Sequence, residues 1–446
     1  MKRHACLIFL SLVLLVFVGC NTASTSGGST AFSDQDGVAA GDDDGPGAPA
    51  GATAGDRDDD SNDGGHGDRD CEPVAPPVWP EPDIEDPAVV SFDEDLFFTI
   101  DGQRFFPLGF YGVPQDPDSL AQYKSEGFNL ALTGPGCCGG GTGPQVDFLR
   151  TAQEQGVFIV THPWSDPNDV LNRPEEELAA ELADRTAIGS LFGWYTFDEP
   201  ALWRPSKELT SRMHEVLTTY SPTNPDGLVE QTMDDFNLYE DDCSFFMIDP
   251  YPVPKMFITN VKDGMKEAIE ATEGEKPIVG VTQAFSWDWI YGNYDQPFRP
   301  TGLEVRNMTW QFIIMGARGL IPFIYATDYS IHAVPEIWEA YLDVIAEINE
   351  LMSVVLADDA AIDLAAETTF PTTFDYLVKQ NETATWVFSV STNDHSLYVT
   401  FDLNAIGDDL CVVDYTTGEI FTPGGDGKVT VPYARLQVRL LEVREN

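Results

Sequence analysis

The sequence predicts an α/β fold: a (β/α)₈ TIM barrel followed by a C-terminal antiparallel β-sandwich. Between about Val90 and Ala357, eight short apolar runs alternate with amphipathic helical stretches. Near-continuous apolar runs are typical of parallel strands that are buried on both faces. After Leu364 the pattern changes to short alternating strands separated by turn residues, which indicates an antiparallel sandwich.

The expected barrel strands are the eight apolar runs, which cover residues 105–111, 128–132, 157–162, 191–197, 228–233, 245–249, 277–283 and 320–325. The expected helices are the amphipathic stretches 119–126, 145–155, 175–186, 206–220, 258–271, 303–316 and 334–356. The connection around 236–239 is too short for a proper helix. Eight strands over this length favour a closed barrel over an open sheet, and no dinucleotide-binding glycine fingerprint follows the first strand. The sandwich strands are expected at 376–379, 385–391, 396–403, 410–414, 428–431 and 437–443.

The charge of the chain excludes one large class of partner. The 446 residues carry 74 acidic and 24 basic side chains, a formal charge of −50. Such a field repels phosphate, so we expect no nucleic-acid partner. A hydrophobic fraction of 43% supplies a large core and excludes global disorder.

The first twenty residues, 1–20, have the features of an export signal. A basic start at Lys2 and Arg3 precedes an apolar run over 7–18, which is too short to span a bilayer comfortably. The run ends Val16-Phe17-Val18-Gly19-Cys20, which resembles the lipobox of bacterial lipoproteins, in which the cysteine is lipidated. That resemblance implies a lipid anchor on Cys20 and a location in the bacterial cell envelope, at the outer membrane or cell surface. The alternative is an ordinary secretory signal in which Cys20 is incidental.

Residues 21–75 are predicted to be a disordered acidic linker. Their composition is Gly, Ala, Ser, Asp and Pro, and twelve aspartates and Glu72 oppose Arg57 and Arg69. Such a segment repels itself and acts as an extended spacer. The barrel domain is then expected at 76–360 and the sandwich domain at 361–446.

The cysteines do not form an obvious disulfide framework. Beyond residue 20 the chain has five of them, so at least one must stay free or pair elsewhere. The adjacent Cys137 and Cys138 could form a vicinal disulfide. Convergent metal ligands are not apparent, and we expect neither a metal nor a cofactor.

The barrel prediction also predicts where the functional residues lie, because they gather at the carboxyl ends of the strands. Carboxylates, amides and aromatic rings occur at these positions, and this mixture suits a carbohydrate. The candidate substrate-binding residues at these strand ends are Asp198, His162, Tyr195, Tyr251, Gln283, Trp287, Tyr325 and Asp328. His162 is equally well interpreted as a hydrogen-bonding residue at the end of a strand.

The most informative motif is Asp198-Glu199-Pro200, directly after the fourth strand. Together with the segments 98–109 and 126–129, it resembles glycoside hydrolases of clan A, which are (β/α)₈ barrels. The resemblance covers the whole barrel and implies that Glu199 is the general acid/base that protonates the glycosidic oxygen. A raised pKa, for example through partial burial beside Asp198, is needed to keep that proton at neutral pH. The structural alternative is a helix start, with Asp198 as the cap and Pro200 in the first turn.

The chain departs from the clan A pattern at two positions. Gln283 stands where the clan places its nucleophilic glutamate, and Asp198 replaces the usual asparagine. Three hypotheses follow. Another carboxylate replaces the nucleophile or serves as the base for water, with Asp249 the first choice ahead of Asp288 and Asp328. Alternatively, the Asp198-Glu199 pair supports substrate-assisted cleavage of N-acetylhexosamines. The third hypothesis is that catalysis is lost and a sugar-binding lipoprotein remains.

The predicted function is therefore hydrolysis of O-glycosidic bonds in an oligosaccharide or polysaccharide, with Glu199 and Asp249 as catalytic residues. The expected partners are a carbohydrate substrate and the membrane, which the protein contacts through its N-terminal lipid anchor. The sequence does not define the sugar, the linkage or the oligomeric state.

Overall fold

The computed structural model describes residue 71 and residues 73–445, except for 134–145, 165, 204, 289–298, 326 and 382. The chain divides into two compact units, 1–69 and 70–446, and all the described residues belong to the second unit. The predicted signal peptide, Cys20, most of the linker and the Cys137-Cys138 pair lie outside the described residues. Within the described part of the chain, no helix is long and apolar enough to cross a membrane.

Seven parallel strands form the central sheet, in the order β10-β9-β8-β7-β6-β5-β4. Neighbouring strands follow one another in the sequence, which is the arrangement expected when each strand is linked to the next by a helix. Every position of the seven strands is buried, except for the last two positions of β7. This burial agrees with the apolar runs in the sequence. The strands are β4 (Gly109–Tyr111), β5 (Leu130–Thr133), β6 (Phe158–Thr161), β7 (Leu191–Asp198), β8 (Asp226–Glu230), β9 (Phe245–Ile248) and β10 (Ile278–Gly280).

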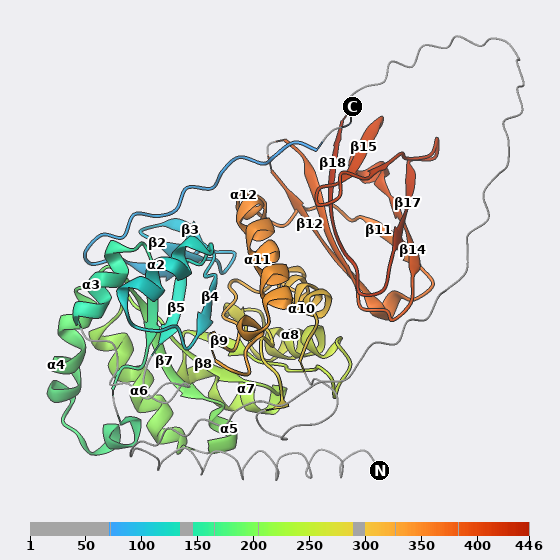
Figure 1. Ribbon diagram of the computed structural model, residues 1–446. Helices are drawn as coiled ribbons and strands as arrows, with labels where there is room; N and C mark the ends of the chain where they lie inside the picture. Colours follow the sequence, from blue (N-terminus) through green and yellow to red (C-terminus); the bar gives the residue numbers. More distant parts are fainter. Residues whose placement is uncertain are drawn as a thin grey trace, which may run out of the picture. The chain divides into compact units, whose positions relative to one another are not determined.

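Helices connect these strands and form an outer layer around them (Figure 1). Side-chain caps define several of the helix starts: Asp116 caps α2, Ser206 caps α6, and Thr301 with Glu304 forms a capping box at α10. The fifth connection contains a seven-residue helix, α7, where the sequence predicted none of proper length. The helices are α2 (Pro117–Ser125), α3 (Val146–Glu154), α4 (Glu175–Thr186), α5 (Pro200–Trp203), α6 (Lys207–Tyr220), α7 (Met233–Tyr239), α8 (Asn260–Ala271), α10 (Gly302–Ile314), α11 (Pro335–Glu350) and α12 (Met352–Val355).

The segment predicted as the eighth strand, 320–325, contacts both edges of the seven-stranded sheet. Leu320 forms isolated parallel bridges with Leu108, next to β4, and with Gly280 of β10. Further backbone hydrogen bonds run from Tyr111 to Pro322 on one side and from Ile321 to Gly280 on the other. These bridges are isolated, so the parallel sheet of the described residues has seven strands where the sequence predicted eight.

A small antiparallel sheet packs against the amino ends of the parallel strands. It comprises β1 (Val90–Phe92), β2 (Phe98–Ile100) and β3 (Gln103–Phe105), in that order. The ring of Phe98 meets Phe192 and Phe245, and the ring of Phe105 meets Phe158, each with centroids 5.1–5.3 Å apart. These aromatic contacts fill the end of the sheet opposite the candidate site.

The C-terminal part of the chain forms two antiparallel sheets with one shared hydrophobic core. The sheet orders are β11-β14-β17 and β12-β13-β18-β15-β16. Side chains of both sheets, including Val399 and Val431 from the first and Val387 and Leu441 from the second, belong to the same buried cluster. The sequence analysis missed the short strands β11 and β16. The strands are β11 (Ala365–Thr368), β12 (Phe374–Gln380), β13 (Thr385–Ser391), β14 (Leu397–Asp402), β15 (Leu410–Asp414), β16 (Ile420–Phe421), β17 (Lys428–Tyr433) and β18 (Val438–Glu445).

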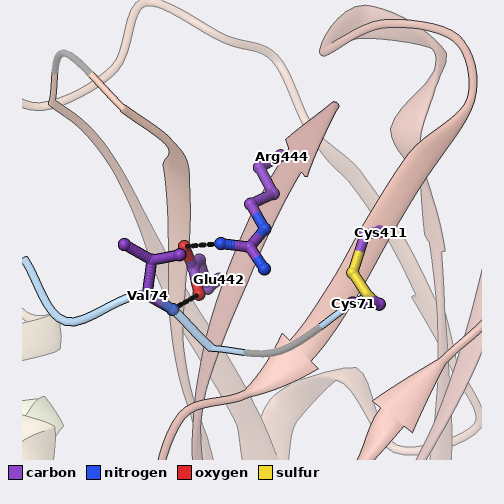
Figure 2. Close-up of a disulfide and its surroundings, with 5 residues drawn as sticks. All are labelled: Cys71, Val74, Cys411, Glu442 and Arg444. Atoms are coloured by element: carbon purple, nitrogen blue, oxygen red, sulfur yellow. Dashed lines mark hydrogen bonds and ion pairs between the residues drawn. A yellow bond between two sulfur atoms is a disulfide. The ribbon is translucent and has the colours of Figure 1, made fainter. Parts of the chain in front are cut away.

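A disulfide joins the start of the described chain to the C-terminal sheets (Figure 2). Cys71 pairs with Cys411 of β15, 340 residues away, with the two Cα atoms 6.1 Å apart. Beside it, the backbone N–H of Val74 donates to Glu442 Oε2 at 3.0 Å, and Arg444 contacts the other oxygen of that carboxylate. Cys243 is buried as a free thiol.

Candidate active site

The candidate site is built on an irregularity at the end of β7. Tyr195 pairs with Gly227 of β8, but Asp198 pairs with Val229, so three residues of β7 advance where β8 advances two. Such a bulge redirects the side chains that follow it. The next residue, Glu199, has a φ of +44°, in the left-handed region that non-glycine residues rarely occupy, and its N–H donates to the carbonyl of Val229. Backbone strain of this kind concentrates at functional sites.

The short helix α5 begins directly after Glu199, but Asp198 is not its cap. The backbone N–H of Ala201 donates to Oε1 of Glu230 at 3.0 Å, so a buried glutamate from the end of β8 satisfies the first turn. Asp198 instead accepts a hydrogen bond from the Tyr195 hydroxyl at 2.8 Å. The helix-start alternative therefore holds for Pro200, in the first turn, and is wrong for Asp198 as a cap.

Glu199 is half-buried, and its environment favours the protonated form. Burial is the largest cause, and the negative charges of Asp198 and Asp235 add to it, so that the pKa of Glu199 rises to about 8. The Gln231 amide donates to Oε1 of Glu199 and opposes this shift. Asp198 keeps a solvent-accessible surface, but protein atoms crowd its carboxyl, and this desolvation raises the pKa of Asp198 as well.

Asp249 provides a second carboxyl beside Glu199. It follows β9 directly and is 5% exposed, and its Oδ1 has no hydrogen-bond partner among the described residues. Burial raises the pKa of Asp249 well above its ordinary value, and the charges of Glu199 and Asp198 raise it further. The Gln231 amide acts on both carboxyls, because its hydrogen bonding lowers the pKa of Asp249 as well as that of Glu199.

A chain of tyrosine hydroxyls leads to Asp198. Tyr111, at the end of β4, donates to the Tyr195 hydroxyl at 3.2 Å, and Tyr195 donates to Asp198. The ring of His162 packs edge-on against Tyr195, with centroids 5.2 Å apart. Burial lowers the pKa of His162 to about 4, so the imidazole is neutral at physiological pH. His162 therefore brings a polar group but no positive charge to this wall of the site.

Tyr251 and Trp287 continue the site in the direction of Asp249. Asp198, Glu199 and Asp249 together form the carboxyl cluster. The Tyr251 hydroxyl belongs beside this cluster, because its hydrogen bonding lowers the pKa of Asp249. Its ring packs edge-on against Phe285 at 4.9 Å and lies 6.2 Å from the ring of Trp287. The two aromatic side chains are half-buried.

Gln283, in contrast, is not placed to contact a substrate. The side chain is fully buried, and its Oε1 accepts from the N–H of Val253 at 2.9 Å while its Nε2 donates to the carbonyl of Val253 at 2.8 Å. The expectation that Gln283 binds substrate is therefore corrected. Its amide holds the loop that follows β9.

Tyr325 is also placed away from the carboxyl cluster. Its hydroxyl donates to Glu126 Oε2 at 2.9 Å, and its ring packs among Phe110, Tyr123 and Trp338 in the layer between the sheet and the helices. The predicted substrate contact at Tyr325 is thus wrong. Asp328 is exposed in the loop after segment 320–325, and none of the described contacts joins it to Glu199.

Four residues of the cluster were missed by the sequence analysis: Tyr111, Glu230, Gln231 and Asp235. Glu230 and Gln231 lie at the carboxyl end of β8, so the rule that was applied to the other strand ends also selects them. Glu230 is 1% exposed, and burial raises its pKa to about 9. No comparable signal marks Asp235, which reaches the cluster from α7. Among the described residues, no group of three or more His, Cys, Asp or Glu side chains is arranged to hold a metal ion.

Comparison with known proteins gives a fold but no family. No protein-family model and no curated protein sequence matches this chain. A glycoside hydrolase of family 5 from Bacteroides vulgatus superposes with a TM-score of 0.54 at 13% identity, over 80% of this chain and 93% of the other. A second structure, described as a glycoside hydrolase, covers 80% of this chain and 97% of its own at a TM-score of 0.51 and 12% identity.

A third similar structure is a family 27 β-L-arabinopyranosidase from Geobacillus stearothermophilus in complex with arabinose. Its TM-score is 0.51 at 12% identity, over 76% of this chain and 97% of the other. At such low identity the likeness concerns the fold alone. The parallel sheet with its helices is thus the fold found in several glycoside hydrolases, as the resemblance to clan A implied.

Proposed function

We propose that this protein hydrolyses O-glycosidic bonds of an oligosaccharide or polysaccharide, with Glu199 as the general acid/base and Asp249 as the second carboxyl. In this mechanism Glu199 gives its proton to the glycosidic oxygen as the bond between that oxygen and the anomeric carbon breaks. In the same step the anomeric carbon gains a new bond by one of two routes. Either the Asp249 carboxylate bonds to it and forms a glycosyl ester, which a water deprotonated by Glu199 later hydrolyses, or a water bonds to it and gives its proton to Asp249. The distance between the two carboxyls in the substrate complex decides between these routes.

The observation that carries the proposal is the shared Gln231 amide. Because the hydrogen bonding of one amide acts on both Glu199 and Asp249, the two carboxyls lie near the same small group. A purely sugar-binding relative has no need of a second buried carboxyl there. Carboxyls this close together release their protons in separate steps, so one member can hold a proton while another is ionised.

Replacement of Glu199 by Gln tests the assignment. We expect E199Q to hydrolyse an unactivated glycoside at least about 100-fold more slowly, because no proton reaches the leaving oxygen. The activity of E199Q on an aryl glycoside, whose leaving group needs no protonation, should fall much less. The variant should still bind sugar. Full activity on the unactivated glycoside contradicts the role of Glu199. Glycan binding without turnover by the unmodified protein instead supports a non-catalytic binding protein.

A second mechanism is favoured by the way Asp198 is held. The Tyr195 hydroxyl orients the Asp198 carboxyl, and Asp198 directly precedes the proposed acid in the sequence. Both features are needed in an aspartate that positions the acetamido group of a substrate. Matched aryl glycosides with 2-acetamido and 2-hydroxyl groups separate the two mechanisms. Exclusive cleavage of the 2-acetamido substrate, abolished in D198N, supports substrate assistance, whereas cleavage of the 2-hydroxyl substrate supports Asp249.

The finer features of the architecture and location form part of the same proposal. Segment 320–325 acts as the eighth strand of a closed barrel, and the two C-terminal sheets form a sandwich. The chain is exported and anchored in the cell envelope by a lipid on Cys20. Incorporation of labelled palmitate into the wild-type protein, but not into C20S, tests the anchor.

A further inference from the structure

A groove of about 700 Å³ lies between the loop after β9 and the C-terminal sheets. Its size falls within the roughly 300–1,000 Å³ range of small-molecule sites. Two large apolar side chains stand at the groove with much of their surface in solvent: Phe257 is 84% exposed and Met256 is 48% exposed. Amide, hydroxyl and charged side chains, including Asn393, Asp394 and Arg435, line the rest.

Buried side chains fix both walls of this groove. Lys262 of α8 donates to the carbonyl of Thr372 at 2.6 Å and pairs with Asp375 at 2.7 Å. Asn307 of α10 donates to the carbonyls of Ser391 and Leu436, each at 2.9 Å. The groove is therefore preformed, so a ligand does not have to order its walls on binding.

The groove also contains a hydroxyl without a partner. Thr392 is 6% exposed and lines the groove, and its Oγ1 has no hydrogen-bond partner among the described residues. Its backbone N–H is satisfied by the carbonyl of Thr373. An orphaned buried hydroxyl destabilises the fold unless a ligand or water completes it.

The groove is continuous with the loop that carries Asp249. Val253 lines the groove and lies four residues after Asp249, a span of at most about 14 Å even for an extended chain. Gln283 fixes this end of the loop through both polar groups of the Val253 backbone. The groove therefore begins within the reach of a few sugar units from Asp249.

We propose that this groove is a second carbohydrate site, which holds a neutral polysaccharide chain beyond the carboxyl cluster. The choice of a glycan rests on the proposed function, and the groove chemistry agrees with it. Phe257 offers an exposed ring for the C–H face of a sugar, while Thr392 and the charged groups lie near enough to bond hydroxyls. The chain's formal charge of −50 disfavours an anionic polymer.

Affinity electrophoresis of the full exported chain tests the site. The protein is run through gels that contain β-glucan, arabinoxylan, galactomannan or starch, and through gels that contain pectin as the anionic comparison. We expect retardation by at least one neutral polymer, with about tenfold weaker affinity for F257A and about fivefold weaker affinity for T392V. T392V should unfold at the same urea concentration as the wild type or a higher one, because it removes an orphaned hydroxyl.

The matched control is Y398A, which removes an exposed aromatic side chain from the same domain outside the groove. It should be retarded like the wild type. Equal retardation of F257A and wild type, or equal loss in F257A and Y398A, overturns the groove site, as does the absence of retardation in every neutral gel. Stronger retardation in the pectin gel than in every neutral gel overturns the proposal that the polysaccharide is neutral. E199Q should be retarded like the wild type, so a failed hydrolysis assay does not affect this result.

Discussion

Both polar atoms of the Gln283 side chain bond to the backbone of Val253, and Nε2 also donates to the carbonyl of Phe285. The contact with Val253 accounts for an amide at the position where the resemblance to clan A hydrolases led us to expect a carboxylate. A glutamate could accept from the Val253 N–H, but it could not donate to the Val253 carbonyl unless it stayed protonated. Gln283 therefore has a structural role at this position.

We predict that Gln283→Glu does not create a nucleophile. The buried carboxylate loses the hydrogen bonds that Nε2 donates to the carbonyls of Val253 and Phe285, and it must be desolvated. The variant should therefore lose about 2–3 kcal/mol of unfolding free energy. Urea denaturation and turnover of an unactivated glycoside are the measurements. Gln283→Met, which removes all the hydrogen bonds of the amide without adding charge, is the matched comparison. A faster and equally stable Q283E would contradict this account.

The pH dependence of kcat/KM should report the proton on Glu199. Because that pKa is raised to about 8, the acid form persists below this pH and activity falls as pH rises through it. Asp235 contributes to the shift by its negative charge, so D235N should move the alkaline limb to lower pH. Its neighbour Asp234 is exposed and has no part in that shift, so D234N should leave the limb in place. Identical alkaline limbs for D235N and wild type would remove Asp235 from the cluster.

The stability of the fold should decrease as the pH rises, because of Glu230. Its pKa is about 9 in the folded protein against an ordinary value of 4.5, so the folded state holds the proton more tightly. The stabilisation is complete below about pH 4.5 and is lost as pH rises through about 9. We expect the wild type to lose a few kcal/mol more than E230Q between pH 5 and pH 9 in urea titrations. E270Q, which changes an exposed glutamate of α8, should follow the wild type, and parallel curves for E230Q and wild type would contradict the prediction.

Removal of the Cys71–Cys411 disulfide should destabilise the protein by about 2–5 kcal/mol, because the bond closes a loop of 340 residues. C71S, C411S and the double variant should be equally affected, since each of them removes the same bond. A reducing agent should lower the thermal midpoint of the wild type to that of C71S and leave C71S unchanged. Additive effects in the double variant would show that the two cysteines act separately.

Much of the parallel sheet could be predicted, because parallel strands that are buried on both faces consist of continuous apolar runs in the sequence. The runs at 158–161 and 245–248 were found in this way, and α4 was predicted with the same bounds that the structure has. Strands β11 and β16 were missed: β11 alternates between exposed and half-buried positions without an apolar side, and β16 has two residues. The helix α7 was missed because its short, acidic start is a weak pattern.

The candidate site was predictable only as a set of strand ends. The rule that functional residues of a barrel gather at the carboxyl ends of its strands located Asp198, Glu199, Asp249 and Tyr251. It could not predict the direction in which each side chain points. Tyr325 shows the difference, because its ring turns into the layer between sheet and helices. The pKa values were likewise beyond the sequence, since they depend on Asp235 and Gln231 approaching from other elements.

The disulfide also decides which part of the protein bears mechanical load. A pull on the residues before Cys71 is transmitted through sulfur to β15, which is flanked by hydrogen-bonded neighbours, β18 and β16, on its two sides. The disulfide thus adds a second covalent path beside the backbone that runs from Val74 toward β1. Part of any such force would thus be borne by the C-terminal sheet before it reaches the strand ends that hold Glu199 and Asp249.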